Sequence, residues 1–112
     1  AKSLGLEIFT PEYAIEELIN NTSDLSKYTK ASENEVKQML EELKSFLTIK
    51  PLDFFKEYKE EGIKLSPDLK DSPFFALALK LNASIWSNEP RLKKQSEISV
   101  FSTSELRMLL NI

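Results

Sequence analysis

The acidic side chains beside short apolar segments are the residues of this sequence whose types and positions could do chemistry. They occur in three separate places, each next to a segment with the composition of a strand or a buried helix. Carboxylates brought to one place repel one another, and a divalent cation relieves that repulsion. Oxygen ligands select Mg²⁺ or Mn²⁺. The acids in these places are Glu16, Glu17, Asp68, Asp71 and Glu89.

Each of these acids also has an ordinary structural explanation. Asp71 stands at a predicted helix start, where capping acids are common, and Glu89 stands in a predicted turn. Glu16 and Glu17 flank an apolar helical stripe, where solvated acids are usual. On a helical wheel continued back from the following helix, however, Asp71 points toward packed surface, where an acid rarely lies unpaired. Taken singly, none of the acids identifies a site.

The composition excludes several other kinds of site. The chain has no Cys and no His, which removes thiol nucleophiles, the usual zinc sites and imidazole catalysis. Its two glycines, Gly5 and Gly62, form no phosphate-binding loop. The net charge of -3 argues against a broadly basic surface. A polyanionic substrate would therefore need bound cations.

The length of 112 residues fits one domain with one hydrophobic core. With 41% hydrophobic and 29% charged residues, the chain reads as a globular protein. No apolar run approaches the ~20 residues that span a bilayer, and no signal peptide is visible. The absence of Cys fits a reducing compartment. We therefore expect a cytoplasmic protein without a membrane partner.

Segments with strand and helix character alternate along the chain. Thr10 and Pro11 supply an N-cap and a first-turn proline, and Ser32 with Glu35 matches a capping box. The run PFFALALKL is apolar nearly all round, so its helix should be buried on more than one side. Predicted strands cover residues 6–10, 46–49, 84–87 and 99–102, and predicted helices begin near residue 11 and cover 33–44, 52–60, 73–81, 90–95 and 105–110.

Further details of the helices follow from apolar spacing and from polar breaks. The polar stretch Asn20–Asp24 is predicted to end the first helix, and Gly62 is predicted to close the helix over residues 52–60. In the helix over residues 33–44, one face carries the apolar side chains. The residues predicted to face inward there are Val36, Met39, Leu40 and Leu43.

This alternation predicts an α/β fold, in which a parallel sheet of four strands is covered by helices on both faces. In open parallel sheets, ligands bind in the crevice beyond the carboxyl ends of the strands. The acids that follow strands, or that open the buried helix, are therefore the ones expected to meet.

Four blocks together resemble, in order, the later blocks of PIN domains, including VapC-type toxins and archaeal stand-alone PIN proteins. The resemblance covers nearly the whole chain and implies a ribonuclease that uses Mg²⁺ or Mn²⁺. The most specific part runs from Asp71 to Leu92, where an acid opens an Ala/Leu-rich helix and a short strand ends in a hydroxyl residue followed by an acid. The blocks are PEYAIEEL, KDSPFFALALKL, IWSNEPRLKKQ and VFSTSELRMLL.

The resemblance also assigns residues to the site. It selects Glu17, directly before a Leu, as the acid of the helix after the family's second strand. It matches Asp71 to the acid that opens the Ala/Leu-rich helix, Ser87 to the hydroxyl at the strand end, and Glu89 to the acid two positions later. The family usually has Asp at this last position. Asp68 is expected to be an outer helper to the metal.

The front of the PIN pattern has no counterpart here. PIN domains begin with a central strand that ends in an Asp, in a typical strand order of three, two, one, four, five. Nothing before Leu6 matches that strand, and Lys2 to Gly5 look like the end of a helix. A central strand makes hydrogen bonds on both sides, so its loss would leave backbone groups unpaired. We expect either an N-terminal segment or a second chain to supply it, the latter as a homo-oligomer.

The function implied by the resemblance is hydrolysis of phosphodiester bonds in single-stranded RNA by the full-length protein. Glu17, Asp71 and Glu89 would hold the metal, water would be the nucleophile, and Ser87 would orient a water or a carboxylate. The partners would be RNA and an antitoxin protein. The alternative is a catalytically silent PIN-like scaffold that binds protein or RNA.

Overall fold

A computed structural model describes residues 6–112 and divides the chain into two compact units. Unit 1 is Ala1–Pro51 and unit 2 is Leu52–Ile112. Each unit is described by itself. The expected helix end at Lys2–Gly5 lies outside the described residues. The prediction of a single domain stays a prediction.

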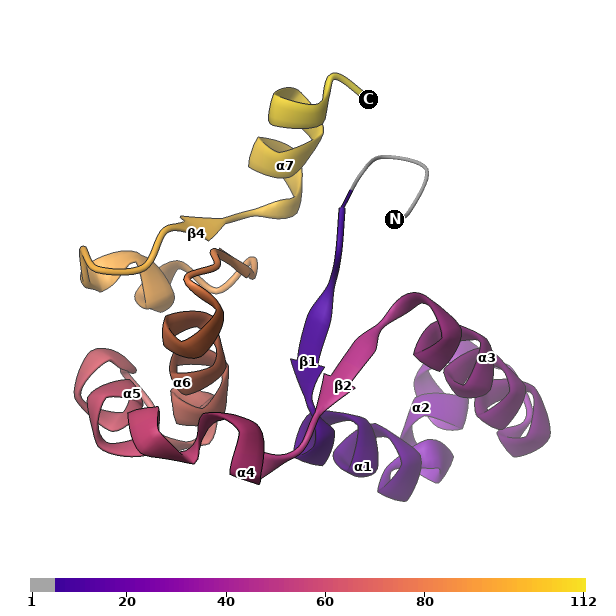
Figure 1. The fold of residues 1–112 in the computed structure, drawn as a ribbon. Coiled ribbons are helices and arrows are strands. Elements are labelled where there is room, and N and C mark those ends of the chain that lie inside the picture. Colours follow the sequence, from indigo (N-terminus) through magenta and orange to yellow (C-terminus); the bar gives the residue numbers. More distant parts are fainter. Residues whose placement is uncertain (1–5) are drawn as a thin grey trace. The chain divides into compact units, whose positions relative to one another are not determined.

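Unit 1 contains two short parallel strands and three helices (Figure 1). The first strand pairs Phe9 with Thr48 and Pro11 with Lys50 of the second. Both predicted strands are confirmed, each shorter than expected and shifted toward the C-terminus. The elements are β1 (Phe9–Pro11), α1 (Glu12–Asn20), α2 (Thr22–Thr29), α3 (Glu33–Phe46) and β2 (Thr48–Lys50).

The start of unit 1 differs from the prediction in two details. Pro11, not Thr10, is the N-cap residue of α1, without a side-chain cap. The polar stretch after α1 ends that helix at Asn20 as predicted, but the chain then re-enters a helix, α2, that the sequence did not predict. The hydroxyl of Thr22, which is buried, donates to the carbonyl of Ile19 and so joins the two helices.

Helix α3 confirms the predicted cap and half of the predicted inner face. Ser32 and Glu35 form the full capping box. Val36 and Leu40 are buried, whereas Met39 is 59% and Leu43 40% exposed. The inward placement of those two residues was wrong, because periodicity identifies the apolar face of a helix without fixing how much of it is covered.

Unit 2 is built around α6, which contacts α5, α4 and β3 (Figure 1). Four of its central residues, Phe75 to Ala78, are buried, which confirms the prediction of a helix enclosed on more than one side. The elements are α4 (Leu52–Phe55), η2 (Lys56–Tyr58), α5 (Lys59–Leu65), η3 (Leu69–Asp71), α6 (Ser72–Leu81), β3 (Ile85–Trp86), η4 (Pro90–Lys94), β4 (Val100–Phe101) and α7 (Thr103–Leu110), where η denotes a 3₁₀ helix.

Gly62 allows α5 and α6 to approach each other closely. A Cβ atom at this position would lie 2.7 Å from the carbonyl oxygen of Ser72 and 2.9 Å from the backbone nitrogen of Ala76. The glycine lies inside α5, so its predicted role as a helix end was wrong. The missing side chain serves helix packing rather than helix termination.

The parallel pair β3–β4 completes the core of unit 2. Ile85 pairs with Val100, and Trp86 pairs with Phe101. The α/β class and the four predicted strands are confirmed, although the described strands form two separate two-stranded sheets. The buried cluster consists of Phe75, Ala78, Ile85, Leu92, Ile98 and Val100.

Candidate active site

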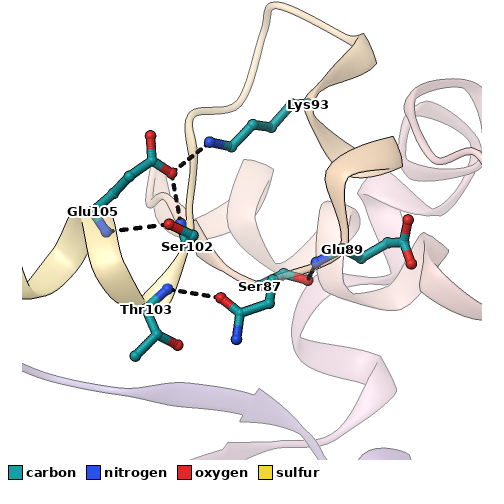
Figure 2. A network of polar contacts seen from close by, with 7 residues as sticks. Ser87, Glu89, Lys93, Ser102, Thr103 and Glu105 are labelled. Carbon is teal, nitrogen blue, oxygen red and sulfur yellow. Dashed lines mark hydrogen bonds and ion pairs between the residues drawn. The ribbon is translucent and has the colours of Figure 1, made fainter.

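Polar and acidic residues follow the carboxyl ends of both strands in unit 2. Ser87 and Glu89 come after β3, and Ser102 comes after β4. Because β3 and β4 are parallel, these residues lie beyond the same edge of the sheet. Figure 2 shows the polar network that they form with the start of α7. This edge is the place where the sequence predicted a site.

Glu89 is held in a fixed position by its neighbours. Its backbone N–H donates to the Ser87 hydroxyl oxygen at 3.1 Å (Figure 2). Its Oε1 atom accepts from the Arg91 backbone N–H at 3.1 Å and from Arg91 Nε at 3.0 Å. The backbone and side-chain hydrogen bonds from Arg91 lower the pKa of Glu89. Glu89 is therefore an ionised carboxylate that also caps η4.

The pKa of Asp71 is shifted in the opposite direction from that of Glu89. It precedes α6 but makes no side-chain capping bond there, so the ordinary explanation of a helix cap does not hold. Partial burial raises its pKa, and the negative charges of Asp68 and Glu89 raise it further, while Arg91 opposes them. Asp68, Glu89 and Arg91 thus lie within electrostatic range of Asp71.

The Asp68 side chain caps a helix in addition to carrying a charge. Its Oδ1 atom accepts from the Lys70 backbone N–H at 3.0 Å and caps η3. One carboxylate oxygen is therefore engaged in holding the turn that leads into α6. Asp68 acts on Asp71 through its charge.

Glu16 and Glu17 belong to unit 1. Both side chains are exposed on α1, and Ile15 beside them is buried. Glu16 and Glu17 are therefore exposed acids of unit 1.

Two residues that sequence reasoning missed hold α7 against the segment that follows β3. The Thr103 backbone N–H donates to Asn88 Oδ1 at 2.8 Å, and Trp86 Nε1 donates to Thr103 Oγ1 at 3.0 Å. These contacts join residues 15 and 17 positions apart, so no local pattern points to them. They fix the chain on either side of Ser87.

A capping box strengthens the same junction (Figure 2). Ser102 and Glu105 cap α7 reciprocally, and Lys93 of η4 forms an ion pair with Glu105. The Lys93 hydrogen bond, followed by those from Ser102, lowers the pKa of Glu105 to about 2. The S-x-x-E pattern at these positions is the signal in the sequence that could have revealed this cap.

Comparison with known protein families shows which family this chain belongs to. A family model described as PIN domain matches residues 1–109, which is nearly the whole chain. The chain belongs to the PIN domain family. Neither the comparison with curated proteins nor that with solved structures gives a match.

PIN domains are generally nucleases that use divalent metals. The described residues contain two parallel strand pairs, β1 with β2 in unit 1 and β3 with β4 in unit 2. None of the helices in residues 6–112 has the length and apolar character needed to cross a membrane.

The donor chemistry of Asp71 and Glu89 fits a divalent metal, because both side chains offer hard carboxylate oxygens. Burial raises the pKa of Asp71, the charges of Asp68 and Glu89 raise it further, and a bound cation would offset that repulsion. Within residues 6–112, no three acidic side chains gather closely enough to hold a metal ion.

Proposed function

We propose that this PIN domain is a metal-dependent endoribonuclease that hydrolyses phosphodiester bonds in single-stranded RNA. The observation that carries the proposal is the partly buried carboxyl group of Asp71, whose pKa is raised by burial and by the negative charges of Asp68 and Glu89, while Glu89 itself follows the carboxyl end of β3. Paired acids of this kind are the usual ligands of metals that activate water for attack on phosphate.

The family pattern supports the site residues of this proposal, and for Asp71 and Glu89 the electrostatics of unit 2 support them as well. Asp71 and Glu89 would hold the metal together with Glu17, and Asp68 would support it from outside. Bound Mg²⁺ or Mn²⁺ would lower the pKa of a water molecule and neutralise charge on the phosphate. All other contributions to catalysis in this proposal come from side chains of the protein.

Ser87 is a positioning residue in this proposal. Its hydroxyl oxygen accepts the Glu89 N–H, so the hydroxyl fixes the backbone that carries the carboxylate. Asn88 and Thr103 anchor the same segment to α7. A carboxylate held on a fixed backbone loses less entropy when it binds a ligand.

RNA would need cations beyond the metal, and the basic residues of η4 are nearest to Glu89. Arg91 is paired with Glu89, and Lys93 is paired with Glu105. Lys94 makes no ion pair with an acid in the described part of the chain. We therefore propose Lys94 as the residue of η4 that contacts the RNA backbone.

The test is Mn²⁺-dependent cleavage of a fluorescent single-stranded RNA by the full-length protein. Asp71→Asn should abolish cleavage, because the amide keeps the shape but loses the charge that holds a metal. Asp53→Asn is the matched control, since Asp53 is an exposed acid of unit 2 whose ion-pair partner among residues 6–112 is Lys56 alone. Cleavage unchanged by Asp71→Asn, with circular dichroism unchanged, would refute the assignment.

A catalytically silent scaffold is the second candidate, and one observation favours it. Glu89 stands where the family usually has Asp, and Arg91 already neutralises its carboxylate. RNA or protein binding without cleavage at any Mn²⁺ concentration would support this function over the nuclease. With either function we expect a cytoplasmic protein that forms homo-oligomers and, if it is a toxin, binds an antitoxin protein.

A further inference from the structure

Arg91 is the basic residue that pairs with Glu89, and the proposed nuclease function leaves it without a role. Two donors of this one residue, its backbone N–H and its Nε, meet the same Oε1 atom of Glu89 at 3.1 Å and 3.0 Å. The side chains of Arg91 and Glu89 are about half exposed, so the pair lies at the surface, where ions can reach it.

The guanidinium group also acts on the second acid of the pair. The Arg91 charge stabilises the ionised form of Asp71, against the repulsion that Asp71 receives from Glu89 and Asp68. Arg91 therefore contacts Glu89 directly and acts on Asp71 only through its charge.

No other basic residue of η4 shares this position. Lys93 is engaged with Glu105, the N3 residue of α7. Lys94 has no acidic partner within ion-pair distance in residues 6–112. Arg91 and Lys94 thus lie on one short helix and carry the same charge, but only Arg91 touches an acid of the site.

We propose that Arg91 is an internal counter-ion of Glu89 that a divalent metal ion must displace, so that Arg91 lowers the metal affinity of the site. The inference rests on the proposed function, because it takes Glu89 as a metal ligand. A metal bound at Oε1 competes directly with Arg91 Nε, and the guanidinium repels the incoming ion. Since arginine stays protonated throughout the physiological range, pH does not relieve this competition.

The experiment measures Mn²⁺ binding to the full-length protein by isothermal titration calorimetry, without RNA. Arg91→Gln should tighten Mn²⁺ binding about 5-fold, the upper end of the range for one solvent-exposed ion pair. The gain should shrink in high salt, which screens exposed charges. Lys94→Gln removes the same charge from the same helix without touching Glu89, and it should change the affinity less than about 2-fold.

A second background tests whether the effect passes through Glu89. In Glu89→Gln, the additional Arg91→Gln change should no longer tighten binding more than Lys94→Gln does. A gain that persists there overturns the inference, as does an Arg91→Gln effect no larger than that of Lys94→Gln. If the wild type binds Mn²⁺ and Arg91→Gln leaves that binding unchanged, only the inference fails. If no variant binds Mn²⁺, the inference and the proposed metal site fail together.

Discussion

Unit 2 buries many more apolar side chains than the described part of unit 1 does, although both units also expose large apolar residues. The core of unit 2 is centred on Phe75, which is fully buried, and draws on α6, β3, η4 and β4. In unit 1, α3 buries Val36 and Leu40 but exposes Met39 and Phe46. The two units thus differ in how many apolar side chains they remove from water.

This difference bears on the site. Asp71 and Glu89 belong to the unit with the continuous core, so their backbone is supported by residues that are buried within that unit. Glu17 lies on an exposed face of the unit with the sparser core. We infer that the unit 2 acids form the preorganised part of the proposed ligand set. Substitutions in each unit test this difference between the two units.

Replacing a core aromatic should separate the two units most clearly. Phe75→Ala should destabilise unit 2 by about 3–5 kcal/mol, because it removes a fully buried ring and leaves a cavity. Phe46→Ala in unit 1, where the ring is 61% exposed, should cost less than about 1 kcal/mol. Urea denaturation followed by circular dichroism reports on the helices of both units, and the fluorescence of Trp86, the single Trp of the chain, reports on unit 2. Equal losses in the two variants would remove the distinction.

Gly62→Ala tests the close contact between α5 and α6. On helix propensity alone, this change inside a helix stabilises by roughly 0.5–1 kcal/mol. Here the added methyl group would meet backbone atoms of α6, so we expect a loss of about 1–3 kcal/mol instead. The sign of the change in the free energy of unfolding decides the matter. A stabilised variant would show that the helices can separate freely.

The two capping boxes provide a matched pair, one in each unit. Ser32→Ala and Ser102→Ala should each cost about 1 kcal/mol, because each leaves a helix N-terminus with an unpaired N–H group. Only Ser102→Ala should move the Trp86 transition, since Trp86 contacts Thr103 at the start of α7. If Ser32→Ala moves that transition as much, the two units unfold as one.

The pH dependence of unit 2 should contain a small contribution from Glu105. Its pKa falls from 4.5 to about 2 in the folded protein, through the hydrogen bonds from Lys93 and Ser102. The unfolded chain therefore binds the proton more tightly, and the contribution is present above pH 4.5 and lost as the pH falls toward 2. Glu105→Gln should flatten the stability profile in that window, and Glu97→Gln, a change of an exposed acid, should leave it as it is.

The sequence was informative where local chemistry decides the structure. The capping box at Ser32 and the buried helix α6 were predicted because their signals lie within a few residues. Four strands were also predicted, because short apolar runs bounded by turn residues usually form strands. Helix α2 was missed because its composition, TSDLSKYT, is polar and has no strong apolar stripe. Its formation depends on packing against α3.

The candidate site was predicted less completely than the fold. Ser87 and Glu89 follow β3, and Asp71 directly precedes α6, but the assignment of these residues to a metal site stays a prediction. The charge of Arg91 on Glu89 was not predicted, because a basic residue two positions after an acid gives no indication of which way its side chain turns. The contacts of Asn88 and Trp86 with Thr103 depend on the parallel pairing of β3 and β4, which no local pattern contains.

The position at which Mn²⁺ binds tests the proposed metal site directly. In ¹⁵N-labelled full-length protein, Mn²⁺ at substoichiometric amounts should first broaden the amide signals around Asp71 and Glu89, and Asp71→Asn should abolish that broadening. Broadening that begins at other acids of unit 2, such as Asp53 or Glu97, and that Asp71→Asn leaves intact, would contradict it.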